Sequence, residues 1–170
     1  MSLITVIRKA TSYDCDAIYQ AHFYAVQYAC KNCYSERILH AWSSILSPQS
    51  YLESLDTKEV WLVEYKHQIQ GFFQLDLAKG EIDALYVHPF VHNKGLGTAL
   101  IQKAENLCMA AQLSSSQLYA SLNSIYFYKL SGYKALQPYR VMLNDKIGID
   151  CLLMKKDLST YYLSLIHISE

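Results

Sequence analysis

The feature that most constrains the fold of this chain is an abrupt change of hydrophobic period around Gly95 and Gly97. Residues 81–87 have strand character, and the segment after the two glycines repeats its apolar residues with helical spacing. A glycine-bearing turn that leads into a helix exposes backbone N–H groups at the positive end of the helix dipole. The stretch therefore predicts a phosphate-binding turn between a strand and a helix.

The helix after this turn is the most strongly predicted element of the chain. Apolar residues share one of its faces, namely Leu96, Leu100, Ala104, Leu107 and Ala111. Polar residues fall mostly away from that face, namely Gln102, Lys103, Glu105 and Asn106. This pattern predicts that one side of the helix packs on a core and the other faces solvent.

The rest of the chain alternates between strand and helix patterns, without an internal repeat or a low-complexity linker. Strands are expected at residues 3–8, 60–65, 69–77, 81–87, 118–120, 139–143 and 150–154. Helices are expected at residues 14–29, after an N-cap at Ser35 with Pro48 as the stop, from Gly97 onward, and at residues 124–130 before a left-handed Gly132. The strands at residues 60–87 form an antiparallel meander, and the whole pattern predicts a mixed α/β fold.

Length and composition indicate one compact domain over residues 1–158, followed by an apolar tail at residues 159–170. The chain has 170 residues, 52% of them hydrophobic, and 15 basic side chains balance 15 acidic ones. This balance disfavours nucleic acid and anionic membranes as partners. We find no apolar run of about 18 residues and no secretory signal before Arg8 and Lys9, so a cytoplasmic protein is expected. For this tail, pairing at a sheet edge, contact with a partner and disorder all stay open. Its apolar character favours a homodimer.

The five cysteines do not form the pattern of a disulfide framework. Their number is odd, and Cys30 and Cys33 form a single CxxC motif without a second pair at zinc-site spacing. Reduced thiols and ordinary helix-end cysteines are therefore favoured over a metal or redox site. We expect no metal in this protein.

Two segments resemble the signature motifs of the GNAT superfamily of N-acetyltransferases. The first is Leu-Tyr-Val-His-Pro at residues 85–89 with His-Asn-Lys-Gly-Leu-Gly at residues 92–97, which is similar to the family's acetyl-CoA motif. The second is Phe-Tyr-Lys-Leu-Ser-Gly-Tyr at residues 127–133, which is similar to its Phe-Tyr-x-x-x-Gly-[Phe/Tyr] segment. Their order and separation also match, and two linked motifs are far more specific than one.

The resemblance implies a fold, a cofactor and a set of contacts. The fold would be a mixed, twisted sheet of six or seven strands flanked by about four helices, and the co-substrate would be acetyl-CoA. The strand residues Leu85, Tyr86 and Val87 would offer backbone groups to the pantetheine arm and thioester. The pyrophosphate would be enclosed by Asn93, Lys94, Gly95, Leu96, Gly97 and Thr98.

His92 departs from the family pattern, because this position usually holds Gln or Arg. A histidine is shorter and only partly charged near neutral pH, so weaker cofactor binding is expected. The alternative is an exposed loop residue without a ligand. Asn123 is a second candidate for a contact to the pantetheine arm, although many relatives place the asparagine two residues earlier, where this chain has Ser121. The alternative role for Asn123 is the N-cap of the short helix.

Tyr128 matches the family tyrosine that protonates the leaving thiolate. A phenol with a pKa of about 10 can keep its proton until a thiolate of lower pKa forms. The alternative is a packed aromatic residue in a chain with 15 tyrosines. Glu81 matches the strand position of the general-base glutamate in the histone-acetylating branch, and Asp83 lies on the same side of the strand. Either carboxylate, or water without a dedicated base, would accept the proton of the amine.

Tyr34 and Trp42 are candidate walls of an acceptor pocket, because aromatic rings give rigid surface and can face a cation. Core packing is the alternative for Trp42. The expected function is transfer of acetyl from acetyl-CoA to a primary amine by direct attack in a ternary complex. The acceptor stays open among small amines, amino acids, antibiotics, peptides and protein lysines. The competing function is a non-catalytic acyl-CoA sensor or protein-interaction module on the same fold.

Overall fold

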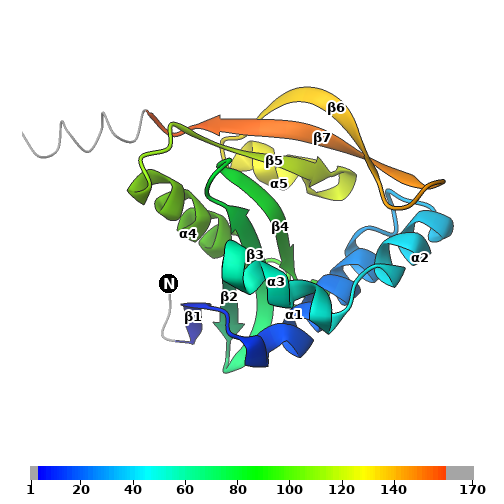
Figure 1. Cartoon of the computed structure of the whole chain (residues 1–170), viewed down its shortest axis with the longest axis horizontal. Helices are drawn as coiled ribbons and strands as arrows, with labels where there is room; N and C mark the ends of the chain where they lie inside the picture. Colours follow the sequence, from blue (N-terminus) through cyan, green and yellow to red (C-terminus); the bar gives the residue numbers. More distant parts are fainter. Residues whose placement is uncertain (1–3, 160–170) are drawn as a thin grey trace, which may run out of the picture.

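A computed structural model describes residues 4–159 of the chain and shows one seven-stranded sheet in the order β1-β2-β3-β4-β5-β7-β6 (Figure 1). The strands are β1 (Thr5–Lys9), β2 (Glu59–Tyr65), β3 (Gln68–Asp76), β4 (Glu81–Val87), β5 (Ser115–Ser121), β6 (Lys134–Met142) and β7 (Gly148–Asp157). All neighbours pair antiparallel except β4 and β5, which are parallel. The expected mixed sheet is confirmed, and the expectations for the tail at residues 160–170 lie outside the described residues.

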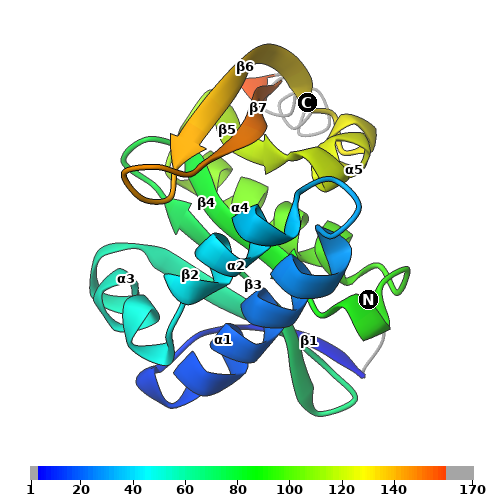
Figure 2. The same ribbon diagram turned by 90° about the vertical axis from the view of Figure 1, so that its right-hand side faces the viewer.

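Helices cover both faces of the sheet. The α-helices are α1 (Cys15–Tyr24), α2 (Glu36–Ser44), α3 (Leu52–Thr57), α4 (Leu96–Ala110) and α5 (Ile125–Leu130). Figure 2 shows α1 and α2 in front of the sheet, with α4 on the side behind it. Short turns of helix complete the chain: η1 (Ser12–Asp14), η2 (Ala25–Ala29), η3 (Pro48–Tyr51), η4 (Pro89–Val91) and η5 (Leu122–Ser124).

Local sequence explains several of these boundaries, and the structure corrects three predictions about the helices. Ser35 caps α2 as predicted, since its side chain accepts a hydrogen bond from the N–H of Ile38. Pro48 does not end α2, which stops at Ser44; it occupies the start of η3, where the missing N–H of proline costs nothing. The predicted helix at residues 14–29 changes at Ala25 into the π-helical turn η2. The prediction also missed α3.

The central helix α4 packs its apolar face on the sheet. Leu96, Leu100 and Ala104 are buried as predicted, but Glu105 was predicted to face solvent and is buried too. Its carboxylate accepts hydrogen bonds from the hydroxyl of Tyr133 at 3.0 Å and from the Nζ of Lys156 at 2.9 Å. Because both partners come from the last third of the chain, helical periodicity could not predict the burial.

Strands β4 and β5 pair only briefly, between the start of β4 and the middle of β5. The ladder between them has two residue pairs, Glu81 with Gln117 and Ile82 with Leu118. Beyond these pairs β5 continues along β7, whereas β4 continues along β3, with a register shift near Gln74. The two strands therefore part at the middle of the sheet, and the second half of β4 has backbone groups that no strand of the described chain pairs on that side.

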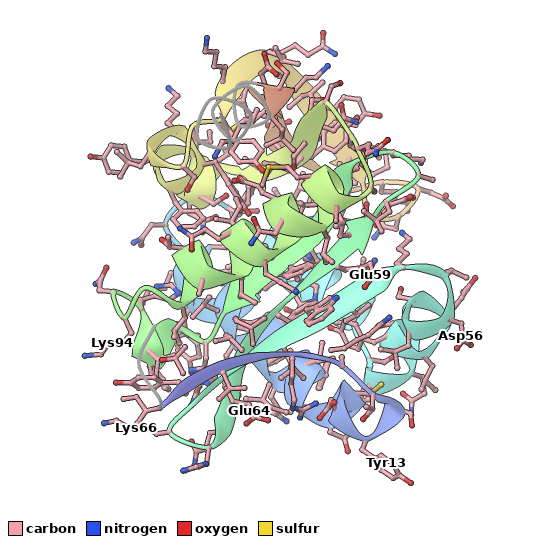
Figure 3. All side chains as sticks on the ribbon, turned by 90° about the vertical axis from the view of Figure 1, so that its left-hand side faces the viewer. Tyr13, Asp56, Glu59, Glu64, Lys66 and Lys94 are labelled. Atoms are coloured by element: carbon pink, nitrogen blue, oxygen red, sulfur yellow. The ribbon has the colours of Figure 1, made fainter. Side chains whose placement is uncertain are left out.

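The first strand of the sheet is fixed by charged side chains at its end. Arg8 donates to Asp14 through both terminal nitrogens at 2.9 Å and to Glu64 through Nε at 2.7 Å. Glu64 lies beside β1 in Figure 3. In the part of the chain that the structure describes, no helix combines the length and the apolar character needed to cross a bilayer.

Candidate functional site

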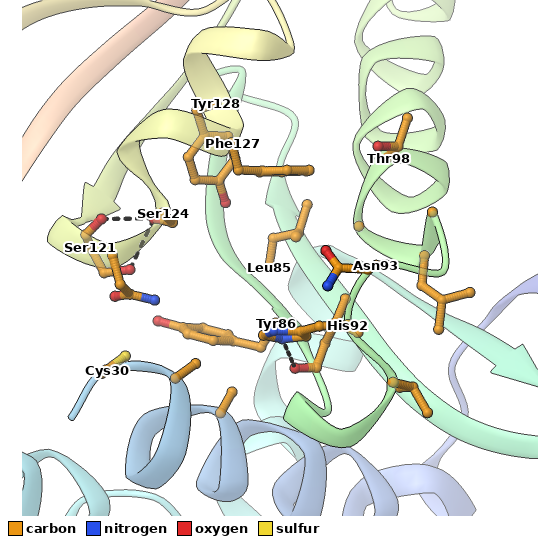
Figure 4. Close-up of a pocket in the computed structure, with 18 residues that line it drawn as sticks. Cys30, Leu85, Tyr86, His92, Asn93, Thr98, Ser121, Ser124, Phe127 and Tyr128 are labelled. Carbon is orange, nitrogen blue, oxygen red and sulfur yellow. Dashed lines mark hydrogen bonds between the residues drawn. The ribbon is translucent and has the colours of Figure 1, made fainter. Parts of the chain in front are cut away.

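A cavity of about 380 Å³ lies where β4 and β5 part (Figure 4). Its walls come from the second half of β4, the turn before α4, the start of α4, the turn η2, and the segment from the end of β5 into α5. The cavity thus joins the two sequence motifs, which are about 30 residues apart in the chain. Of the predicted cofactor contacts, Lys94 is the one that does not line it.

The turn before α4 has the geometry of an anion-binding site. Asn93 and Gly95 adopt positive φ angles of 65° and 76°, and Gly95 precedes the first residue of α4. No side chain caps this helix start, so its first N–H groups remain available. A Cβ added at Gly95 would have no atom within 4 Å, because that position opens away from the protein. The turn can therefore hold a diphosphate against the helix dipole.

Gly97 has a different reason to be glycine. A Cβ at this position would lie 3.2 Å from the ring of Phe127, closer than ordinary van der Waals contact. Both residues line the cavity, so the glycine lets α4 approach α5 beside the phosphate turn. The backbone of the first motif therefore lies close to the ring of Phe127 in the second.

His92 is held by the strand that precedes it. Its Nε2 lies 3.2 Å from the carbonyl oxygen of Val87, and because a carbonyl only accepts, Nε2 carries the proton of this hydrogen bond. The side chain is exposed at the cavity edge, as Figure 4 shows, and its Nδ1 has no protein partner among the described residues. His92 therefore lies at the edge of the cavity, at the position where the resemblance implies Gln or Arg, and its Nε2 is already hydrogen-bonded to Val87.

Tyr128 projects from α5 into the cavity, and its hydroxyl points toward Leu85 and Tyr86 (Figure 4). Its ring packs edge-on against Phe127 and Tyr133. Burial raises the pKa of Tyr128 above its usual value. No hydrogen bond engages its hydroxyl within residues 4–159, so the phenol is a protonated donor directed at the empty side of the pocket.

Asn123 lines the cavity from η5 and does not cap a helix. Ser121 occupies the N-cap position of η5, and Ser124 occupies that of α5. The hydroxyls of these two serines are 3.0 Å apart, and Ser124 also donates to the carbonyl of Ser121 at 2.8 Å. The capping role predicted as an alternative for Asn123 is therefore wrong, and its amide is available to the pocket.

Glu81 and Asp83 lie at the start of β4 and do not line the cavity. Glu81 accepts a hydrogen bond from Nε2 of Gln117 at 3.1 Å, and Asp83 is paired with Lys58. Burial, and then the hydrogen bond with Asp83, raises the pKa of Glu81. The carboxylates are close to each other, as the strand pattern predicted, and both lie outside the cavity lining.

Tyr34 and Trp42 are core residues and form no wall of the cavity. Tyr34 is 8% exposed and Trp42 6% exposed, and their rings meet edge-on at 5.8 Å within a cluster that includes Ile149. The hydroxyl of Tyr34 donates to the carbonyl of Asp150 at 2.6 Å, and burial raises its pKa to about 12. Tyr34 and Trp42 therefore pack in the core and lie outside the cavity.

Sequence reasoning missed one wall of the cavity. Ala25 and Ala29 line it from the π-helical turn η2, and Cys30 lines it from the residue that follows this turn. Cys30 is buried, whereas Cys33 is exposed. A π-helical turn often marks a functional site, but nothing in the helical pattern of residues 14–29 revealed it. No group of three or more His, Cys, Asp and Glu residues suited to a metal occurs among the residues that the structure describes.

Comparisons with known proteins agree with this arrangement. The family model described as an acetyltransferase (GNAT) domain matches residues 30–158. The comparison with curated proteins finds no significant match.

Solved structures with this fold are numerous. A GCN5-related N-acetyltransferase from Rhodopseudomonas palustris is 24% identical, with a TM-score of 0.86 over 93% of this chain and 98% of that one. The PaiA N-acetyltransferase of Thermoplasma acidophilum, solved with coenzyme A, is 22% identical, with a TM-score of 0.75 over 92% and 99% of the two chains. YncA of Salmonella typhimurium, solved with its cofactor acetyl-CoA, is 19% identical, with a TM-score of 0.61 over 91% and 94%. These likenesses establish the fold of residues 4–159.

Proposed function

This chain belongs to the GNAT acetyltransferase family, and on that premise we propose that it transfers an acetyl group from acetyl-CoA to a primary amine by direct attack in a ternary complex. The observation that carries the proposal is the placement of the phosphate turn and Tyr128 on one cavity between β4 and β5. Two of the similar structures contain coenzyme A or acetyl-CoA. We propose that the acetyltransferase domain spans residues 1–158.

The turn and the open edge of β4 suit the two chemically different parts of acetyl-CoA. The N–H groups from Asn93 to Thr98 would bind the pyrophosphate at the start of α4. The unpaired backbone of Leu85 to Val87 would bind the amides of the pantetheine arm, much as a neighbouring strand would. The amide of Asn123 offers a further contact from the opposite side of the cavity.

Tyr128 has the position and the proton needed at the leaving group. As the amine nitrogen forms its bond to the thioester carbon, the carbon–sulfur bond breaks and sulfur leaves as a thiolate. Tyr128 donates its proton to that sulfur, whose own pKa rises in the same water-poor pocket. The amine must lose a proton as well, and Glu81, with Asp83 beside it, is the proposed acceptor through intervening water.

The test of cofactor binding is a calorimetric titration with acetyl-CoA, using the matched variants Gly95→Asp and Gly95→Asn. Both side chains tolerate the left-handed backbone of Gly95 and differ in charge alone. We expect micromolar affinity for the wild type, a small loss for Gly95→Asn, and a loss of about tenfold or more for Gly95→Asp that shrinks in high salt. Equal affinity of the two variants would contradict a phosphate site at this turn.

The test of catalysis is release of the coenzyme A thiol with and without an amine. Tyr128→Phe should lower the amine-dependent kcat by about 10- to 100-fold and leave the Kd of acetyl-CoA unchanged, since it removes one proton donor. The competing function, an acyl-CoA sensor, predicts that acetyl-CoA binds while thiol release stays the same with every amine.

A further inference from the structure

Tyr86 reaches across the floor of the cavity with a side chain that three aromatic rings hold in place. The ring of His22 from α1 stacks on it at 4.1 Å with an interplanar angle of 26°. Trp42 from α2 meets its edge at 6.4 Å, and Phe72 from β3 lies 6.2 Å away. Rings packed in this way restrict the torsions of a tyrosine, so the position of the Tyr86 hydroxyl is fixed before any ligand arrives.

The support behind this ring is electrically neutral. His22 is buried and its Nδ1 lies 2.9 Å from the hydroxyl of Tyr51. Burial lowers the pKa of His22 to about 3, so the imidazole is uncharged at neutral pH. The three rings therefore orient Tyr86 without adding a charge to this end of the cavity.

The hydroxyl of Tyr86 has no hydrogen-bond partner in the described part of the protein, and this half-buried residue lines the cavity. Figure 4 shows it at the end of the cavity near Cys30 and Ser121, with His92 and Asn93 at the other end. A hydroxyl that faces a cavity without a protein partner can hydrogen-bond to a ligand there. The hydroxyl of Tyr128 points into the space between the two ends.

One side of the cavity near Tyr86 is bounded by a packed cluster. The hydroxyl of Tyr34 accepts a hydrogen bond from the N–H of Leu122 at 2.9 Å and donates one to the carbonyl of Asp150. These bonds fasten the connection between α1 and α2 to η5 and to β7, and the side chains of Val26, Cys30 and Ile149 belong to the same cluster as Tyr34. A folded protein segment that approached Tyr86 from this side would have to displace the cluster.

We infer that the Tyr86 hydroxyl is the group that binds and orients the acceptor, and that the acceptor is a small amine rather than a lysine within a protein chain. The inference rests on the proposed acetyl transfer and adds to it a residue and a substrate class. With the pyrophosphate at Asn93 to Thr98 and the thioester under Tyr128, the acceptor nitrogen approaches from the far end. There the phenolic oxygen of Tyr86 accepts a hydrogen bond from an N–H of the uncharged amine and leaves the nitrogen lone pair free to attack.

The variant that tests this role is Tyr86→Phe, with Tyr139→Phe as its control. Each change removes one phenolic hydroxyl, but Tyr139 is an exposed residue of β6 that does not line the cavity. Steady-state thiol release would be measured with butylamine, with benzylamine and with a short lysine-containing peptide. Calorimetry would measure binding of acetyl-CoA to the free protein and of benzylamine to the protein saturated with coenzyme A.

We expect Tyr86→Phe to raise the KM and the Kd of the small amine by about five- to tenfold, the effect of one lost hydrogen bond. The Kd of acetyl-CoA should change less than about twofold, and Tyr139→Phe should leave both affinities close to those of the wild type. The small amines should have a kcat/KM about tenfold or more above that of the peptide. Unchanged amine affinity in Tyr86→Phe, an equal loss of acetyl-CoA affinity, or a preference for the peptide would overturn the inference.

Failure of the proposed function gives a different result. A protein that binds benzylamine through Tyr86, but releases no thiol in its presence, would retain the acceptor site and contradict acetyl transfer. A protein that acetylates the amines equally well with and without the Tyr86 hydroxyl would support acetyl transfer and contradict the role of Tyr86.

Discussion

The hydroxyl of Tyr34 accepts a hydrogen bond from the backbone N–H of Leu122, 88 residues further along the chain, at 2.9 Å. Leu122 is the first residue of η5, the turn that places Asn123 on the cavity. Tyr34 does not line the cavity itself, so we expect it to act as a positioning residue for Asn123.

Tyr34→Phe should therefore weaken acetyl-CoA binding about three- to tenfold and lower the free energy of unfolding by about 1–2 kcal/mol, because two partly buried hydrogen bonds to the backbone are lost. Calorimetry and urea denaturation measure the two effects. Tyr139→Phe, at an exposed tyrosine of β6, is the control that should change neither. If Tyr34→Phe loses stability but keeps its acetyl-CoA affinity, Tyr34 has a purely structural role.

Glu81→Gln should lower the amine-dependent kcat by about tenfold or more, because the variant cannot accept a proton. In the wild type, the rate should rise as pH increases through the raised pKa of Glu81, since a base acts only when it is deprotonated. That acidic limb of the pH profile should be lost in Glu81→Gln. Asp83→Asn is the companion variant: loss of activity there alone would assign the base to Asp83, and full activity in both variants would leave water as the acceptor.

The stability of the protein should fall as pH decreases from about 6.5, the pKa of histidine in the unfolded chain, toward the pKa of about 3 that burial gives His22. The folded pKa is the lower one, so the unfolded chain takes up protons first and the stability is lost as pH falls. This single group accounts for about 2 kcal/mol between pH 6.5 and 5. Urea denaturation at both pH values should show a smaller difference in His22→Phe, and an unchanged difference would contradict the assignment.

His92→Arg should tighten acetyl-CoA binding about three- to tenfold at low salt, because it adds a permanent positive charge beside the phosphate turn. His92→Gln removes the imidazole without adding a charge and should bind close to the wild type. Pantetheine, which has no phosphate, should bind His92→Arg and the wild type equally. A gain that persists for pantetheine, or in high salt, would mean that the charge does not act on the phosphates.

Much of the fold followed from local pattern. The strands at residues 60–87 and the helix after Gly95 were predicted because period and glycine placement are properties of adjacent residues. The burial of Glu105 was not predicted, because it depends on Tyr133 and Lys156, which are brought to the helix by the tertiary fold. Helix α3 was missed because it is short and has no buried residue to give it a pattern.

The site was predicted as far as its motifs extend. The turn at Asn93 to Thr98 and the side chain of Tyr128 meet at one cavity, and their roles there stay predictions. The end of the cavity near Tyr86 was not predictable, because it depends on how the segment around η2 packs against β7 in the folded protein. This packing makes Tyr34 a core residue, and the cavity is lined instead by the small residues Ala25 and Ala29, which have no chemical signature in a sequence.

The two-pair contact between β4 and β5 also has a mechanical consequence. The sheet consists of a four-stranded part and a three-stranded part joined by a short seam, with α4 and α5 in contact beside it. A ligand that hydrogen-bonds to the open edge of β4 and to the end of β5 would link the two parts of the sheet while it is bound. The domain would therefore be stiffer with the ligand bound than without it, and its stiffness would change during each catalytic cycle.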